Sequence, residues 1–211
     1  SSMLCRVLDG RDLEEICPID EAILTPDERA RYRQLRPPHQ RALAFHTRAE
    51  LRRMLGREIG LAPQSVPLEY DINGKPHCPH PRAKGLEFSV SCAHRCSLIA
   101  IGEASGLGVD VERTVETEPD GDLLEIVFSE RELDAWLSVP PGMRRIAFTD
   151  AWTIKEATLK AMGVGLNGSP HDITVRFNDE GRALPVFKDP NCIFGRVNFC
   201  PCYSASCVMI L

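Results

Sequence analysis

The stretch that decides the fold is Gly108-Val109-Asp110-Val111-Glu112, in which acidic residues alternate with valines. Residues i and i+2 of a strand project to the same face, so the two carboxylates point one way and the two valines point the other way. The pattern predicts a strand that has one face in a core and presents two carboxylates on its opposite face.

A second informative stretch lies downstream, at Trp152-Thr153-Ile154-Lys155-Glu156-Ala157-Thr158-Leu159-Lys160. If it is helical, Glu156 and Lys160 are neighbours on one face, which Trp152 shares. Mg²⁺ is usually bound by a few carboxylates together with substrate phosphates and water, so three carboxylates suit a metal and the lysine suits a phosphate. Either stretch alone is more simply a half-exposed strand or a solvated helix, but their joint presence favours a site.

Further motifs accompany these two stretches in a fixed order. They are Gly74-Lys75-Pro76, Phe128-Ser129-Glu130-Arg131-Glu132, and Gly163, Gly165 and Leu166 after the helix. With the two stretches above, this set resembles the 4′-phosphopantetheinyl transferases of the Sfp-like (surfactin synthetase) branch, over residues 25 to 175 or thereabouts.

The resemblance implies an enzyme that transfers the 4′-phosphopantetheine arm of coenzyme A to a serine hydroxyl of an apo acyl or peptidyl carrier protein. The reaction releases 3′,5′-adenosine bisphosphate, depends on Mg²⁺ or the similarly hard Mn²⁺, and serves fatty acid, polyketide or nonribosomal peptide biosynthesis. The resemblance also implies two similar subdomains related by a pseudo-twofold, with coenzyme A in the cleft between them, and a monomer.

Carried over to this sequence, the family pattern makes Asp110, Glu112 and Glu156 the metal ligands, with Asp110 counted as catalytic. Lys160 is expected to neutralise or protonate the leaving phosphate. Glu156, directly or through a water molecule on the metal, is the candidate base for the acceptor serine. Lys155 lies about 100° from Glu156 around a helix, so we expect it to approach the phosphates or the rim of the cleft.

The resemblance assigns residues nearer the N-terminus to the 3′-phosphate and adenine end of coenzyme A, namely Lys75, Pro76, Arg31 and Arg41. Ser91 and Cys92 occupy the position of a Ser-His pair in the family. The thiol of Cys92 is a poorer phosphate partner than the family's imidazole. His94 lies two residues further on and shares its face if the strand continues, so it is a candidate replacement.

Local patterns predict an α+β fold with two halves, residues 1–105 and 106–211, each with a long helix packed on a small, mainly antiparallel sheet. Thr25-Pro26-Asp27-Glu28 is a capping box that begins a helix ending near Leu35, and Ser129 begins a second capping box. Other expected helices cover residues 39–57, 120–128 and 142–162. Expected strands cover residues 86–91, 97–101, 108–113, 173–177, 183–187, 193–199 and 203–211.

Charge is distributed unevenly along the 211 residues, whose net charge is −5. Residues 29–57 hold nine arginines and one acid, whereas residues 103–134 hold eleven acids and two arginines. A basic stretch can bind nucleic acid, a polyphosphate or an acidic protein, or simply solvate a helix. Few aromatic residues, Tyr32 and Phe45, interleave with these arginines for base stacking, and no nucleic-acid motif is present, so coenzyme A or an acidic carrier protein fits better.

The nine cysteines are scattered and lack the spacing of a zinc site, so we expect reduced thiols that pack as small apolar groups. No apolar run approaches 18 residues, and the segment from Ser1 has no signal-peptide core. These features predict a cytoplasmic protein with no membrane partner.

Two other functions remain open at this level. The first is a non-catalytic module of the same fold that binds coenzyme A or a carrier protein, as the replacement of histidine by Cys92 would allow. The second is a different Mg²⁺-dependent phosphate enzyme, such as a phosphohydrolase or nucleotidyl transferase, which the carboxylates alone would permit. This second function would proceed without a carrier protein.

Overall fold

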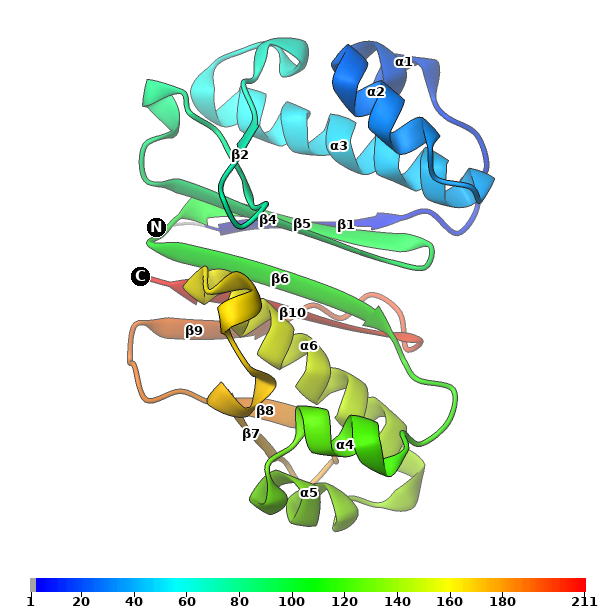
Figure 1. Ribbon diagram of the computed structural model, residues 1–211, viewed down its shortest axis with the longest axis vertical. Coiled ribbons are helices and arrows are strands. Elements are labelled where there is room, and N and C mark those ends of the chain that lie inside the picture. The colour runs from blue at the N-terminus through cyan, green and yellow to red at the C-terminus, as the bar shows by residue number, and fades with distance from the viewer. Residues whose placement is uncertain (1–2) are drawn as a thin grey trace.

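The computed structural model describes residues 3–211 and has four stacked layers, a long helix, two antiparallel sheets and a second long helix (Figure 1). For convenience, residues 3–105 are called the first half and residues 106–211 the second half. The first half contains β1 (Met3–Asp9), α1 (Pro18–Ile23), α2 (Pro26–Arg33), α3 (Pro38–Ile59), β2 (Glu69–Tyr70), β3 (Pro76–His77), β4 (Leu86–Ala93) and β5 (Cys96–Glu103).

The second half contains two short helices before its long one. Its elements are β6 (Gly106–Arg113), α4 (Gly121–Val127), α5 (Glu130–Leu137), α6 (Arg144–Met162), β7 (Thr174–Phe177), β8 (Ala183–Val186), β9 (Cys192–Arg196) and β10 (Tyr203–Ile210). The predicted helices and strands are present, with ends that differ by a few residues. Strands β1, β2 and β3 and helix α1 were not expected from the sequence. Strand β1 is an edge strand in which only Leu8 is buried, and β2 and β3 are two residues long.

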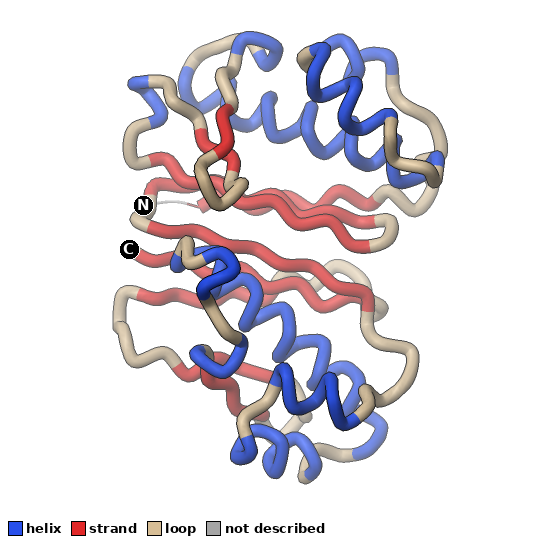
Figure 2. Tube along the Cα trace, in the orientation of Figure 1, coloured by secondary structure: helices blue, strands red, loops and turns tan. Residues whose placement is uncertain are grey.

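Each half contributes one three-stranded antiparallel sheet, with strand orders β1-β5-β4 and β6-β10-β9. The pairs β2-β3 and β7-β8 form two further small ribbons (Figure 2). These small antiparallel sheets with packed helices confirm the predicted α+β class.

Both predicted capping boxes are formed, and each begins a helix. The Thr25 hydroxyl accepts the Glu28 N–H while the Glu28 carboxylate accepts the Thr25 N–H, and Ser129 and Glu132 do the same at α5. Such reciprocal bonds satisfy two N–H groups that a helix start otherwise leaves without partners.

Three apolar clusters hold the layers together. The first joins α3 to one face of the first sheet through Leu51, Leu55 and Phe88. The second fills the space between the two sheets and includes Val109 and Val111, so the predicted core face of this strand is confirmed. The third lies between α5, α6 and the β7-β8 ribbon.

Helix α6, the second long helix, lies close to β6 because Gly108 has no side chain. A Cβ added to Gly108 would lie 2.0 Å from the Ala157 carbonyl oxygen and 2.5 Å from the Ala161 nitrogen of α6. Only glycine leaves room for this helix backbone against the strand. The glycine that opens the Gly108–Glu112 motif therefore brings α6 to the carboxylates of β6.

Ion pairs within the first half take up part of its basic stretch. Arg52 is buried and pairs with Glu28 at 2.7 Å, and Arg53 pairs with Asp20 at 2.5 Å. The arginines of α3 are therefore not one solvated face. Across residues 3–211, no helix combines the length and apolar character needed to cross a bilayer.

Candidate active site

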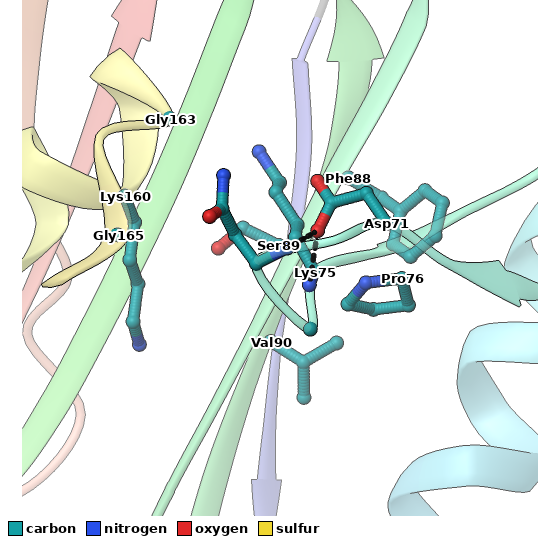
Figure 3. A pocket seen from close by; sticks show the side chains of 11 residues that line it. Asp71, Lys75, Pro76, Phe88, Ser89, Val90, Lys160, Gly163 and Gly165 are labelled. Carbon is teal, nitrogen blue, oxygen red and sulfur yellow. Dashed lines mark hydrogen bonds between the residues drawn. The ribbon is translucent and has the colours of Figure 1, made fainter.

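A cavity of about 280 Å³ lies where the two halves meet. Its walls are the β2-β3 turn with Asp71 and Gly74-Lys75-Pro76, strand β4 with Ser89 and Val90, and the C-terminal end of α6 with Lys160 and Gly163. Figure 3 shows Lys160 extending from α6 on one side, with Asp71, Lys75 and Pro76 on the other. Motifs that are distant in the sequence thus share one cavity.

Two further cavities continue this one toward α2 and α3. A cavity of about 120 Å³ shares Pro76 and Val90 with the first one. It in turn shares Tyr32, Ala44 and Cys92 with a third cavity of about 390 Å³. The three together form a furrow long enough to suggest an extended ligand, such as a nucleotide with a flexible arm.

Asp110 is the most buried carboxylate of the site, with 5% of its surface exposed. Its Oδ1 accepts a hydrogen bond from the Ser91 hydroxyl at 3.1 Å and lies 3.5 Å from the Lys160 ammonium, while its Oδ2 has no partner. Burial raises the pKa of Asp110 to about 7; Lys160 opposes this rise, and Glu112 and Glu156 add to it. A buried carboxylate oxygen without a partner suits a ligand that supplies positive charge.

Glu112 and Glu156 are half-buried and face the same region. Burial raises the pKa of each, and the Lys160 ammonium lowers both. The negative charge of Glu156 further raises the pKa of Glu112, whereas a hydrogen bond from Trp152 lowers it. The three predicted metal ligands therefore interact electrostatically across β6 and α6.

The donor set fits a hard divalent cation, although no compact cage is formed. Among residues 3–211, no group of three or more His, Cys, Asp or Glu side chains lies close enough together to hold a metal ion. Mg²⁺ rarely uses an all-protein cage and usually takes one or two carboxylates, with phosphate oxygens and water completing its shell. The unpartnered Oδ2 of Asp110 and its acidic neighbours fit that mode of binding.

Lys160 lies on the cavity wall beside Asp110, one of the predicted metal ligands. Its ammonium donates to the Val109 carbonyl at 3.0 Å, lies beside Asp110, and is 36% exposed on the cavity wall. A lysine in this position can meet a phosphate without losing its contact with β6.

Lys155 does not reach the cavity, so its predicted role near the phosphates is wrong. The side chain is fully buried, and its ammonium donates to the Val127 carbonyl at 2.7 Å, to Glu132 at 2.8 Å and to the Pro170 carbonyl at 3.0 Å. These three acceptors use all three N–H groups of the ammonium. Lys155 therefore ties α6 to α5 and to the segment before β7.

Lys75 and Pro76 both line the main cavity. The Lys75 ammonium lies 3.7 Å from Glu87 and 3.5 Å from the Leu107 carbonyl, and the backbone N–H of Lys75 donates to the Asp71 carboxylate at 2.8 Å. Ser91 is turned toward the second half, where its hydroxyl accepts the Val111 N–H at 3.1 Å and donates to Asp110. It therefore orients Asp110.

The two arginines predicted for the 3′-phosphate have different surroundings. Arg31 lines the third cavity, and its guanidinium donates to the Tyr70 hydroxyl at 2.7 Å. The Arg41 guanidinium instead donates to the Leu35 and Arg36 carbonyls at 2.8 and 2.6 Å. The structure thus brings Arg31 to the furrow and uses Arg41 to hold the turn between α2 and α3.

Cys92 and His94 line the same cavity, although β4 ends at Ala93 and His94 adopts a left-handed turn with φ of 53°. Desolvation and the charges of Arg113 and Arg95 lower the pKa of His94, which makes its imidazole a weak anion partner. Desolvation by the surrounding residues raises the pKa of Cys92, although its side chain opens onto the furrow, so its thiol also stays neutral. Neither residue supplies a positive charge.

Sequence reasoning missed two residues of the furrow, Ser89 and Arg48, and Tyr70 beside it. Ser89 accepts the Val109 N–H at 3.0 Å and, with Ser91, joins β4 to β6. Tyr70 and Arg48 meet through a hydrogen bond of 2.8 Å beside the smallest cavity. The alternating serines were a visible signal, whereas Tyr70 and Arg48 come together only through the fold.

Comparison with known proteins agrees with the motifs. The profile of the 4′-phosphopantetheinyl transferase superfamily matches residues 106–198. The chain is 33% identical over 146 residues to 4′-phosphopantetheinyl transferase HetI of Nostoc sp. (strain PCC 7120), covering 69% of the chain and 62% of the relative. It is 27% identical over 157 residues to 4′-phosphopantetheinyl transferase psf-1 of Bacillus pumilus, covering 72% and 64% respectively.

A 4′-phosphopantetheinyl transferase of Bacillus subtilis is also similar, at 25% identity over 143 residues that cover 66% of the chain and 62% of the relative. Over the matched residues the chain is similar to members of the 4′-phosphopantetheinyl transferase superfamily, which confirms the predicted resemblance to the Sfp-like branch. In these three comparisons the chain spans less than two thirds of the relative's own length.

Proposed function

We propose that this protein transfers the phosphopantetheine arm of coenzyme A to a serine of an apo acyl or peptidyl carrier protein, with Mg²⁺ as the metal. One observation carries the proposal. Lys160, beside Asp110 of the second half, shares a cavity with Gly74-Lys75-Pro76 of the first half. The furrow therefore has a phosphate-binding cation and a buried acid at one end and arginines at the other.

In this proposal, each half would bind a different part of the substrate complex. In the proposal, residues 1–105 and 106–211 are subdomains related by a pseudo-twofold, and coenzyme A lies in the furrow between them. The first half would bind the adenine and 3′-phosphate through Lys75, Pro76 and Arg31. Because both walls come from one chain, we propose that a monomer acts, and that it does so in the cytoplasm.

Asp110, Glu112 and Glu156 would hold the divalent metal. When bound, the ion would neutralise negative charge on the pyrophosphate of coenzyme A. The protein would present these three carboxylates in a partly desolvated environment. Ser91 contributes by holding Oδ1 of Asp110, which leaves Oδ2 free.

Glu156 would accept the proton of the acceptor serine as its hydroxyl oxygen attacks the β-phosphorus. The new bond joins the serine oxygen to that phosphorus, and the bond that breaks joins the phosphorus to the bridging oxygen of the pyrophosphate. The leaving group is 3′,5′-adenosine bisphosphate. Lys160 would neutralise its developing charge or give it a proton.

Intact-mass spectrometry of a panel of apo carrier proteins tests the proposal. Each carrier is incubated with the protein, coenzyme A and Mg²⁺, with a control that contains a chelator. Transfer to a serine adds about 340 Da, and we expect this gain only when metal is present. No gain on any carrier, with coenzyme A binding intact, would contradict catalysis and support a non-catalytic module. Breakdown of coenzyme A without a carrier would instead indicate a phosphohydrolase.

A further inference from the structure

Three sulfur-containing side chains, Met3, Cys5 and Cys207, lie outside the furrow and have no assigned role. Met3 and Cys5 are two residues apart on β1, so both project from the same face of that strand. Cys207 lies on β10, and its thiol donates to the Met3 sulfur at 3.2 Å. Because β1 belongs to the first half and β10 to the second, this sulfur cluster spans the boundary between the two halves.

The sulfur cluster faces the core between the two sheets. Cys207 is 2% exposed within the apolar cluster that fills this space, and Cys5 packs against the same apolar cluster. The opposite face of β1 meets α3 instead, since Arg6 pairs with Glu50 of that helix. Strand alternation therefore turns Met3 and Cys5 toward β10.

The two thiols of the cluster also interact electrostatically. Burial raises the pKa of Cys5 to about 11 and that of Cys207 to about 12, and the charge that Cys5 would carry as a thiolate adds to the rise at Cys207. An electrostatic effect of one thiol on the other requires that the two groups lie close together. Both thiols are therefore neutral in the free protein and lie near each other in the apolar core.

We propose that Met3, Cys5 and Cys207 form a binding site for a soft metal ion, and that Cu(I) is the ion it suits. Thiolate and thioether sulfurs select Cu(I), whereas carboxylate, carbonyl and water oxygens suit Mg²⁺. On binding, the ion displaces one proton from each thiol to the solvent and gains two thiolates and one thioether as ligands. Met3 is 37% exposed, so the ion can enter from the surface. The site does not depend on the proposed transfer reaction.

Competition for Cu(I) with bicinchoninate, without oxygen and with ascorbate as reductant, tests the site. For Cys207→Ala we expect the affinity for one equivalent of Cu(I) to fall about 100-fold or more, because a thiolate is lost from the core. Met3→Leu keeps the volume and removes only the weaker thioether, so we expect a fall of about 10-fold. Cys200→Ser is the matched control outside the cluster and should change nothing. Equal affinity of Cys207→Ala and the wild type would overturn the site.

X-ray absorption spectroscopy of the wild-type protein with one equivalent of Cu(I) does not depend on a variant that folds. The expected first shell around the copper contains three sulfur atoms and no nitrogen or oxygen. A shell of two sulfur atoms would point to Cys200 and Cys202, which are two residues apart in the sequence. A nitrogen neighbour would point to a histidine, and either result would overturn the proposal.

Thermal unfolding shows whether the ion joins the two halves. Because β1 and β10 come together only in the folded chain, Cu(I) should bind the folded state in preference to the unfolded one. Free Cu(I) at about 100 times its dissociation constant should raise the melting temperature of the wild type by about 5–10 °C and leave that of Cys207→Ala unchanged. An unchanged melting temperature of the wild type would mean that the three side chains only pack as apolar groups, and would overturn the proposal.

Discussion

The two long helices, α3 and α6, lie on the outer faces of the two sheets in similar ways but pack by different means. Helix α3 meets its sheet through large side chains such as Leu51 and Leu55. Helix α6 meets β6 through Ala157 and Ala161, against the bare backbone of Gly108. Large side chains hold a helix away from a sheet, whereas alanine and glycine let the two backbones approach. The second arrangement brings Lys160 of the helix against the backbone of the strand, where its ammonium donates to the Val109 carbonyl.

The two helices also differ in how their buried charges are satisfied. On α3, Arg52 and Arg53 pair with Glu28 and Asp20. Between α6 and β6, three acids share one exposed lysine, and the Oδ2 of Asp110 has no partner. Balanced buried charges hold a structure together, whereas unbalanced ones are typical of functional sites. The comparison indicates that the buried charges of α3 stabilise the fold, whereas those between α6 and β6 are available for chemistry.

The largest expected effect is a difference in unfolding free energy between variants of Lys155 and Lys160, the two lysines of α6. Lys155→Met leaves the buried carboxylate of Glu132 without its cation, and should lower the free energy of unfolding by about 3–5 kcal/mol in urea denaturation. Lys160→Met should change it by less than about 1 kcal/mol, because this lysine is partly exposed, but should abolish most transfer. If Lys155→Met has wild-type stability and loses only activity, Lys155 belongs to the site after all.

Gly108→Ala tests whether close packing of α6 matters. The added methyl group would collide with the Ala157 carbonyl, so the helix must move, at a cost of about 3 kcal/mol in unfolding free energy. Gly195→Ala in β9 is a matched control, since a methyl group there meets nothing within 4 Å. Equal stability of the two variants would show that α6 can shift freely on β6.

Asp110→Asn tests whether the buried charge of Asp110 destabilises the metal-free protein, through the dependence of the unfolding free energy on pH. Because the pKa of Asp110 is raised to about 7, the folded protein binds this proton more tightly than the unfolded chain. Without metal, its contribution to stability is therefore full below about pH 4 and is lost as pH rises through 7. In EDTA at pH 8 we expect Asp110→Asn to be more stable than wild type by about 2 kcal/mol. A variant less stable than wild type at that pH would contradict the account.

The smallest effect is expected at Cys92→His. The position is exposed to the furrow, so an imidazole should fit with a change in unfolding free energy below about 1 kcal/mol. Affinity for coenzyme A, measured by calorimetry, should rise by a few-fold at pH 6, where the ring is charged, and less at pH 8. A large loss of affinity would mean that the cavity is organised around the thiol.

Part of the candidate site could be predicted from the motifs in the sequence. Strand periodicity puts Asp110 and Glu112 on one face of a strand, and helix periodicity puts Glu156 and Lys160 on one face of a helix, whereas only the fold brings the two faces together. Both capping boxes were also predictable, since they depend on residues three apart. Edge strand β1 could not be predicted, because an edge with one buried residue shows little alternation.

Lys155 shows why other details escape sequence reasoning. The helical angle placed it correctly beside Glu156, but what it faces depends on α5 and the segment before β7, which arrive from elsewhere in the chain. The same applies to Arg48 and Tyr70, which are joined by a tertiary contact. Periodicity predicts the face on which a residue lies, and packing decides its partner.

The central claim is that α6 carries the chemistry, and Glu156→Gln tests it most directly. The measurement is single-turnover transfer to a carrier protein with saturating coenzyme A and Mg²⁺, with Glu58→Gln on α3 as the matched control. The account predicts a fall of about 100-fold or more for Glu156→Gln, with an unchanged melting curve, and no change for Glu58→Gln. Wild-type turnover by Glu156→Gln would contradict the account.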